Sequence, residues 1–174
     1  LPEVAENGPR RCYYCKRAIF SLIFERARRD GYDTVIDGTN ASDQVDDRPG
    51  MQALAELGVL SPLRMCGVTK AQVRELSAEA GLFTARKPSY ACLATRVPTG
   101  TAITREALEK VERGEEALRE MGFSDLRLRL EGTGARLELP AAQLPAVVQN
   151  RERVLKALLP SFSRVTVDLA GRTK

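Results

Sequence analysis

The chain has 174 residues, of which 43% are apolar and 29% are charged, so it can bury one sizeable core or two small ones and is not disordered by composition. No run approaches the roughly twenty apolar residues that cross a bilayer, and no secretion signal opens the chain, so we expect a cytoplasmic protein without a membrane partner. The net charge of +4 suits an anionic small molecule as well as nucleic acid.

The first part of the chain is predicted to alternate helices and strands. Apolar spacing, caps and glycine stops predict a helix over 16–29 closed by Gly31, a strand over 34–36, a helix from Pro49 to Gly58, a strand over 62–67, and a helix from the Thr69–Gln72 capping box to Gly81. Strands that alternate with helices favour a parallel sheet with right-handed crossovers. This order predicts an α/β domain over residues 1–98.

A second domain over residues 99–174 is predicted from a change of composition at the linker 98–100. A helix capped by Thr104 is expected to run to about Met121. Alternating apolar residues then predict a hairpin of strands over 126–130 and 137–139. A helical apolar pattern predicts a helix over 142–158, and a last alternating run predicts a strand over 165–169. The predicted fold class is therefore α/β, with a parallel-sheet domain followed by a small α+β domain.

Cys12 and Cys15 form a C-x-x-C pair just before a predicted helix, in a chain with four cysteines and no histidine. Two thiolates at this spacing can bind one metal ion or one corner of a cluster, and Cys92 would supply a third ligand. Basic residues on both sides of the pair favour the thiolate form. We expect these three cysteines to converge on a metal centre; the alternative is two unconnected buried cysteines.

Zinc bound by all four cysteines is the main competing interpretation, because closed structural zinc sites require four ligands. The fourth cysteine, Cys66, lies in a predicted apolar strand and precedes Gly67, where a free cysteine behaves as a small core residue. Three thiolates without a fourth favour an iron–sulfur cluster with one open iron. A structural disulfide is not expected in an intracellular protein.

The second domain carries polar residues that are candidates for anion binding. Arg127 and Arg129 point to one side of their predicted strand and suit a phosphate or a carboxylate, unless they pair with Glu138 across the hairpin as a solvated face. Glu115 interrupts the apolar stripe of its predicted helix. A carboxylate at a core position either binds Mg²⁺ or forms a salt bridge with one of those two arginines.

An acidic stretch follows the strand predicted over 34–36. Four aspartates lie in it, namely Asp37, Asp43, Asp46 and Asp47. Charge of this kind is usually a solvated loop, but the carboxyl ends of parallel strands are also where ligands bind. The sequence leaves these two interpretations equally open.

Several segments resemble the LarE family of ATP-dependent sulfur transferases, which are PP-loop ATP pyrophosphatases. They are RCYYCK, DGTNASDQVDDRPG, TKAQVRELSAEAGL, KPSYACLATRVPTGTAIT, and LRLRLEGTGARLELP with the terminal VTVDL. In this order they are specific and cover nearly the whole chain. The resemblance implies a PP-loop, Rossmann-like first domain.

The resemblance implies that ATP with Mg²⁺ adenylylates a carboxylate of pyridinium-3,5-dicarboxylate mononucleotide, and that sulfur is then delivered to make a thiocarboxylate for the nickel-pincer cofactor of lactate racemase. Some members sacrifice the sulfur of one of their own cysteines, but that position is Ala91 here. Others carry three cysteines, matched here by Cys12, Cys15 and Cys92, and resemble transferases that bind sulfur on the open iron of a 4Fe-4S cluster.

Individual contacts are also implied by the resemblance. By position, substrate or phosphate contacts fall on Thr95, Arg96, Arg127 and Arg129, and acidic metal or substrate ligands on Asp43 and Glu115. The family's Ser-Gly-Gly-x-Asp-Ser phosphate loop does not occur in these 174 residues. We therefore expect an incomplete parallel sheet, a missing segment before Leu1, and little adenylylation by this chain alone.

Two other functions compete with this one. A cluster-dependent enzyme of tRNA thiolation would carry a basic extension or a zinc ribbon, and the sequence has neither. A non-catalytic scaffold that binds zinc or a cluster is the other alternative. The resemblance favours a small nucleotide-like substrate over nucleic acid, and it implies a homo-oligomer.

Overall fold

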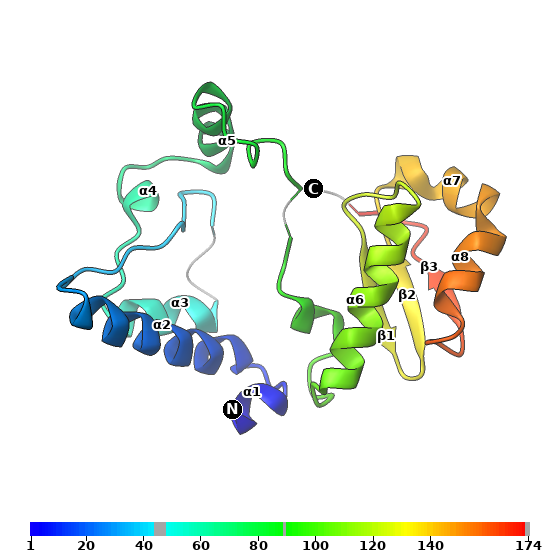
Figure 1. Cartoon of the computed structure of the whole chain (residues 1–174), viewed down its shortest axis with the longest axis horizontal. Helices are drawn as coiled ribbons and strands as arrows, with labels where there is room; N and C mark the ends of the chain where they lie inside the picture. The colour runs from blue at the N-terminus through cyan, green and yellow to red at the C-terminus, as the bar shows by residue number, and fades with distance from the viewer. Residues whose placement is uncertain (44–47, 89, 173–174) are drawn as a thin grey trace. The chain divides into compact units, whose positions relative to one another are not determined.

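A computed structural model describes the chain over residues 1–43, 48–88 and 90–172, and the chain divides into two compact units, Leu1–Lys87 and Pro88–Lys174 (Figure 1). The first unit contains the helices α1 (Pro2–Ala5), α2 (Arg11–Arg29), α3 (Pro49–Glu56), α4 (Pro62–Met65) and α5 (Lys70–Glu79). The second contains η1 (Leu93–Arg96), α6 (Arg105–Glu120), β1 (Arg127–Glu131), β2 (Gly134–Glu138), η2 (Ala141–Gln143), α7 (Leu144–Gln149), α8 (Arg151–Leu158) and β3 (Val165–Val167).

The boundary between the units lies after Lys87, whereas the composition placed it at residue 98. The reason is that η1 contacts α6 and β1, so the segment that carries it belongs to the second unit. In the part of the chain that the structure describes, no helix is both long and apolar enough to cross a membrane.

Helices α2 and α3 pack side by side in the first unit (Figure 1). Tyr13 of α2 and Ala53 and Leu54 of α3 are buried. Gly50 allows the close approach, because a Cβ at that position would lie 3.1 Å from the side chain of Lys16. The predicted helix over 16–29 is thus confirmed, and it begins earlier than expected, at Arg11.

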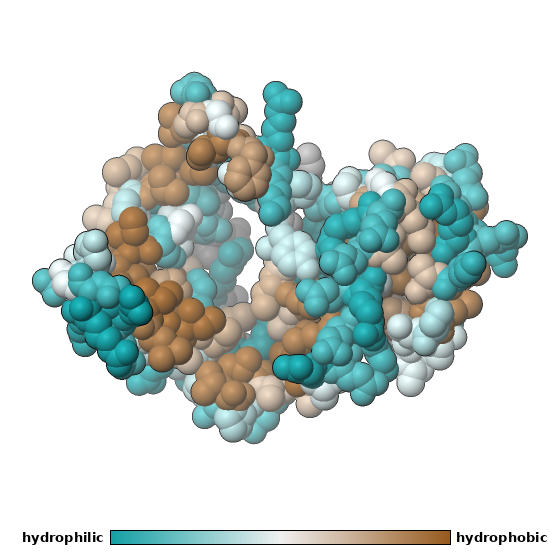
Figure 2. Space-filling view, in the orientation of Figure 1, coloured by the Kyte–Doolittle hydropathy of each residue, from teal (hydrophilic) through white to brown (hydrophobic). Residues whose placement is uncertain are grey.

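The apolar side chains that predicted α2 are not covered within the first unit. Ile19, Leu22 and Ile23 are all exposed there. Figure 2 shows apolar side chains gathered on the surface over α2 and α3. The helix is therefore stabilised within this unit by α3 and by its own polar contacts more than by burial of its full apolar face.

The strand predicted over 62–67 is wrong, because this segment forms the short helix α4. Pro62 occupies the first helical turn, where its fixed φ and missing N–H are tolerated. Gly67 follows the helix with a φ of +69°, a conformation that favours glycine and closes the segment. The short apolar run was compatible with either a helix or a strand.

The extended pairing of the first unit lies just before α4. Ile36 and Leu60 form an isolated parallel bridge, in which the Leu60 amide donates to the Val35 carbonyl at 3.0 Å and the Asp37 amide donates to the Leu60 carbonyl at 2.9 Å. The predicted strand over 34–36 is thus reduced to one bridge. Among the residues described for this unit, this bridge is the parallel pairing found in place of the predicted parallel sheet.

The helix α5 begins as the sequence predicts. Thr69 accepts a hydrogen bond from the Gln72 amide, and the Gln72 side chain bonds back to the Thr69 amide, which completes the capping box. Such a box satisfies two amide donors that would otherwise have no partner at the start of the helix.

The second unit contains a three-stranded sheet in the order β1-β2-β3. The strands β1 and β2 form the predicted antiparallel hairpin, and β3 joins β2 in parallel after the chain passes through α7 and α8. Leu128 pairs with Leu137, and both are fully buried against α6 and α8. Gly114 lets α6 approach, because a Cβ there would lie 2.5 Å from the Leu128 side chain.

The helix predicted over 142–158 is divided into η2, α7 and α8. Asn150 separates α7 from α8 with a backbone at φ −95° and ψ 19°, and its side-chain amide donates to the Ala146 carbonyl at 2.8 Å. Asparagine favours such local bonds over a continuous helix. The helix from Thr104, the hairpin and the last strand are confirmed.

Candidate functional site

Cys12 and Cys15 lie in the first turns of α2, inside the helix rather than just before it. Residues three apart in a helix share a face, so the two thiols are neighbours on one side of α2. Cys12 is exposed and Cys15 is half-buried. The Arg11 guanidinium donates to the Cys12 Sγ at 3.6 Å.

Tyr13, between the two cysteines, ties the start of α2 to α3. Its hydroxyl donates to Glu56 Oε2 at 2.6 Å and accepts from Arg17 Nη1 at 3.2 Å. The Arg10 guanidinium lies 4.4 Å from the centre of its ring. The hydrogen bond from Tyr13 lowers the pKa of Glu56. These contacts fix the rotation of α2 and therefore the direction in which the cysteine pair points.

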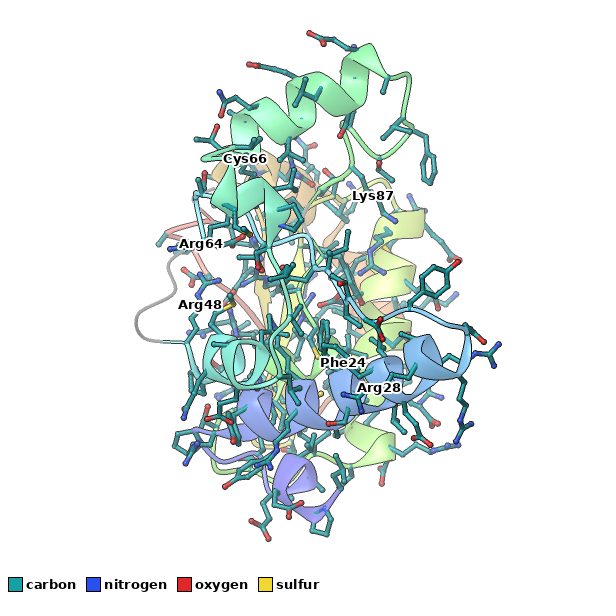
Figure 3. All side chains as sticks on the ribbon, turned by 90° about the vertical axis from the view of Figure 1, so that its left-hand side faces the viewer. Phe24, Arg28, Arg48, Arg64, Cys66 and Lys87 are labelled. Atoms are coloured by element: carbon teal, nitrogen blue, oxygen red, sulfur yellow. The ribbon has the colours of Figure 1, made fainter. Side chains whose placement is uncertain are left out.

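Cys66 does not lie with the cysteine pair. It follows α4 as its C-terminal cap and is exposed, so the prediction of a core role in a strand is wrong. Figure 3 shows Cys66 beside α4, well separated from the ribbon of α2, and Figure 1 shows the same separation of the two helices. Zinc bound by all four cysteines therefore has no support from the arrangement of this unit.

The acidic loop after the bridge at Ile36 is held by two arginines. Arg64 donates to the Asp43 carbonyl at 2.7 Å, and Arg48 lies 3.7 Å from the Asp43 carboxylate. Figure 3 shows both arginines on the same side of the first unit. Asp46 and Asp47, the other aspartates of the acidic stretch, lie outside the described residues.

Asp37 accepts three hydrogen bonds at the beginning of this loop. Its carboxylate accepts from the Thr39 amide at 3.1 Å, from the Thr39 hydroxyl at 2.5 Å and from the Ser61 hydroxyl at 2.7 Å. Burial raises the pKa of Asp37, but these hydrogen bonds and the charge of Lys16 outweigh it, so its pKa lies below the ordinary value. Asp37 therefore acts within the loop as a charged acceptor.

Cys92 in the second unit precedes η1, and its backbone is held by the residues of that turn. The Cys92 carbonyl accepts from the Thr95 amide at 3.0 Å and from the Thr95 hydroxyl at 2.8 Å. Arg96 Nη1 donates to the Ala91 carbonyl at 3.2 Å. Arg129 Nη1 in turn donates to the Thr95 carbonyl at 2.9 Å. The exposed thiol of Cys92 is thus presented by a loop with a defined backbone.

Arg96 and Glu115 form a buried ion pair that anchors this loop to α6. Arg96 is 2% exposed and Glu115 is fully buried. Each Glu115 oxygen accepts two hydrogen bonds. Oε1 accepts from Arg96 Nε at 2.7 Å and from the Leu128 amide at 3.0 Å. Oε2 accepts from Arg96 Nη2 at 3.2 Å and from Arg119 Nη2 at 2.7 Å. Binding of a metal ion by Glu115 would require it to give up one of these bonds.

The expected salt bridge of Glu115 is confirmed, but its partners are different from those predicted. The sequence suggested Arg127 or Arg129, whereas the structure pairs Glu115 with Arg96 and Arg119. The two predicted arginines lie on the opposite, polar face of the sheet, because Leu128 between them faces the core. Periodicity identified the unusual carboxylate without identifying the arginines that approach it.

The polar face of the sheet carries a concentration of positive charge. Arg129 Nε donates to Glu138 Oε1 at 2.6 Å, so the pairing with Glu138 is confirmed for this arginine. Within the described part of the chain, no carboxylate lies within ion-pair distance of Arg127. Burial lowers the pKa of Arg127, and the charges of Arg172, Arg96 and Arg129 lower it further against the opposing effect of Glu138.

Arg172 joins this cluster from the end of the chain, and the sequence analysis missed it. Its Nη2 lies 3.4 Å from Asp125 Oδ1, and its buried Nε has no hydrogen-bond partner among the described residues. The signal was absent from the sequence because the residue follows the last strand in a segment without periodicity. Arg172, Arg96 and Arg129 thus all act electrostatically on Arg127, and binding of an anion by these arginines stays a prediction.

The described residues of neither unit complete a metal site. In the described ranges, no group of three or more cysteine, aspartate or glutamate side chains is arranged to hold a metal ion. Cys12 and Cys15 belong to the first unit and Cys92 to the second. The convergence of the three cysteines stays a prediction.

Comparisons with known proteins identify three relatives. No protein-family model matches the chain. An uncharacterised protein of Synechocystis is 39% identical over 98% of this chain, and one of Methanocaldococcus jannaschii is 30% identical over 97%. The pyridinium-3,5-bisthiocarboxylic acid mononucleotide synthase of Lactiplantibacillus plantarum is 34% identical over 97% of this chain.

The chain spans somewhat less than two thirds of the length of these relatives. It covers 65% of the Synechocystis protein, 66% of the Methanocaldococcus protein and 61% of the Lactiplantibacillus synthase. The similarity nevertheless extends over nearly all of both units of this chain. The chain is thus related, along almost its whole length, to a synthase of a sulfur-containing pyridinium mononucleotide.

Proposed function

We propose that this chain provides the cysteine centre and the substrate-anion site of an ATP-dependent sulfur transferase that converts a pyridinium dicarboxylate mononucleotide into its thiocarboxylate. The observation that carries the proposal is Arg127, a partly buried guanidinium without an ion-pair partner among the described residues, beside three other guanidinium groups, in a relative of the Lactiplantibacillus synthase. A phosphate or carboxylate is the ligand that such a cluster of arginines fits.

The proposed reaction has two balanced steps. A substrate carboxylate oxygen attacks the α-phosphorus of ATP, and pyrophosphate leaves. Sulfur at the oxidation level of sulfide then forms a bond to the carboxyl carbon, while the bond from that carbon to the adenylate oxygen breaks and AMP leaves. Neither step consumes an oxidant or a reductant. Binding of ATP and Mg²⁺ would require a phosphate loop, and the expected loop is not among these residues.

The residues of this chain have separate tasks in this scheme. Arg127 and Arg129 bind the anionic part of the substrate. Thr95 connects Arg129 to the Cys92 loop, because its carbonyl accepts from Arg129 and its hydroxyl donates to the Cys92 carbonyl. Substrate bound at the arginines would therefore lie on the same connected structure as the Cys92 loop.

A 4Fe-4S cluster is the group that the three cysteines fit by the chemistry of their donors. Cys12, Cys15 and Cys92 would supply three thiolates, and Cys12 and Cys15 are neighbours on one helix face. The cluster would supply an open iron at which sulfide can be held. The Tyr13–Glu56 bond fixes the direction of the cysteine pair on α2, and Arg96 fixes the backbone on both sides of Cys92.

The decisive experiment is anaerobic reconstitution of the chain with iron and sulfide, followed by measurement of iron, zinc and visible absorbance. We expect about four iron atoms per chain. Cys12→Ser and Cys92→Ser should lose them, whereas the matched control Cys66→Ser should keep them, because Cys66 lies apart from the pair. Tightly bound zinc that requires Cys66, or iron that survives loss of Cys92, would refute the three-cysteine centre.

The activity is tested on a fusion protein. In it, this chain is joined to the segment of a relative that this chain does not cover. The substrate would be pyridinium-3,5-dicarboxylate mononucleotide with ATP, Mg²⁺ and sulfide, and mass spectrometry would detect replacement of a carboxyl oxygen by sulfur. Formation of AMP and pyrophosphate without the sulfur product in the wild-type protein would show that sulfur transfer is not its function.

A further inference from the structure

Tyr90 is an exposed aromatic residue in the loop that carries Cys92. It belongs to the second unit and is 56% exposed. Its ring contacts two guanidinium groups: the Cζ atom of Arg96 lies 5.4 Å from the ring centre, and that of Arg119 lies 5.2 Å from it. Guanidinium groups at such distances are attracted to an aromatic ring. The ring is therefore held in place although more than half of the residue is open to solvent.

The two guanidinium groups that hold the ring are themselves fixed. Both donate to Glu115 Oε2, Arg96 from its Nη2 at 3.2 Å and Arg119 from its Nη2 at 2.7 Å, so they lie next to each other. Glu115 is fully buried. Tyr90 thus packs against a buried ion pair and has less freedom to rotate than an unattached surface side chain. A flat surface that is already ordered binds a ligand at a lower entropic cost.

Tyr90 also lies close to the cysteine of its loop. Arg96 Nη1 donates to the Ala91 carbonyl at 3.2 Å and to the Cys92 carbonyl at 3.4 Å. The same side chain therefore positions both the ring of Tyr90 and the backbone of Cys92. Two residues of chain span at most about 7 Å between their Cα atoms. A molecule that rests on the Tyr90 ring is consequently beside the Cys92 loop.

We propose that the Tyr90 ring is the surface on which the pyridinium ring of the substrate stacks, with a ring carboxylate directed toward Arg119. The proposal rests on the proposed function and identifies the residue that recognises the ring of the substrate. Aromatic rings attract one another in offset stacks. Arg119 is 39% exposed, so it can donate a further charge-assisted bond to a carboxylate. A planar ring that bears carboxylates matches both the aromatic surface and the positive charge beside it.

The test compares two probes that carry the same two carboxylates and differ in the ring: pyridine-3,5-dicarboxylate and cis-cyclohexane-1,3-dicarboxylate. NMR titration of the chain measures their affinities. The wild type should bind the aromatic probe about three- to tenfold more tightly than the saturated one, the effect of one stacked aromatic pair. Tyr90→Leu should reduce this ratio to within about twofold of one. The matched control Tyr32→Leu, which removes an exposed tyrosine of the first unit, should leave the ratio unchanged.

A second measurement separates stacking from a purely structural role of Tyr90. If the ring only shields the Arg96–Glu115 pair, Tyr90→Leu lowers the thermal unfolding midpoint and leaves the ratio of the two affinities as it is. Stacking instead moves the ring protons of the aromatic probe upfield, because they lie over the tyrosine ring. Tyr90→Phe keeps the ring and should keep both the shift and the ratio. A folded Tyr90→Phe variant without them would overturn the proposal.

The results also distinguish this inference from the proposed function. Equal affinity of the wild type for the two probes, or binding of neither, would show that Tyr90 does not recognise the ring, while the iron and sulfur measurements still decide the transferase function. A ratio that survives Tyr90→Leu would assign the ring to another residue. A ratio that requires Tyr90, found together with AMP but no sulfur product from the fusion protein, would support the aromatic site and refute sulfur transfer.

Discussion

The replacement Glu115→Gln tests whether the buried ion pair stabilises the second unit. Glutamine has nearly the same shape, but its amide group would place donors against Arg96 Nη2 and Arg119 Nη2, which now donate to Glu115 Oε2 at 3.2 and 2.7 Å. Arg96 would then remain charged at 2% exposure without a counter-ion. Breaking a buried pair in this way destabilises a protein by about 3 to 5 kcal/mol.

The expected loss is at the lower end of that range, about 3 kcal/mol, because Arg119 is 39% exposed and its bond is screened by solvent. Urea unfolding followed by circular dichroism measures it, with Glu116→Gln as the control: the neighbouring exposed residue of α6 should change stability by less than about 0.5 kcal/mol. A loss below about 1 kcal/mol for Glu115→Gln would show that the pair only offsets its own desolvation, and would refute the reasoning.

Three further changes test the local contacts. The stability that Asp37 contributes is present above its unfolded pKa, near 4, and is lost as the pH falls through its lower folded pKa. Between pH 6 and pH 3, Asp37→Asn should therefore lose less free energy of unfolding than the wild type in urea unfolding. An equal loss in both proteins would contradict this. Gly114→Ala should destabilise by about 1 to 3 kcal/mol in the same assay, because its Cβ would overlap Leu128 by more than helix propensity regains; a more stable variant would show that the core can adjust. Tyr13→Phe should raise the pKa of Glu56 in a carboxyl NMR titration, since the hydroxyl bond lowers it, and no rise would contradict the bond.

The second unit could be predicted well because its signals are local. The cap at Thr104 and the alternation of the hairpin depend on residues a few positions apart, and both features are present. The prediction of a strand over 62–67 is wrong because a short apolar run does not distinguish a helix from a strand. Pro62 favours the helix, since it lies in the first helical turn. The long helix predicted over 142–158 failed because Asn150 was not recognised as a break.

The candidate site was predictable in its residue types and not in its pairings. A carboxylate in an apolar stripe identified Glu115, but Arg96 approaches it from nineteen positions earlier in the chain, a relation that no periodicity contains. Arg172 was missed for the same reason, since its charge acts on Arg127 only because of the order of strands in the sheet. The likeness of the cysteine pattern to a family was visible in the sequence, whereas the placement of those cysteines depends on both units.

The hydrogen bond from the Leu128 amide to Glu115 also has a consequence for the behaviour of the protein at high concentration. The strand β1 is at the edge of the sheet, where an unpaired backbone donor is a template for the strand of another molecule. Glu115 occupies that donor from within the same unit. The carboxylate that neutralises Arg96 therefore also protects one position of the strand edge from intermolecular β-pairing, so its loss would favour aggregation as well as unfolding.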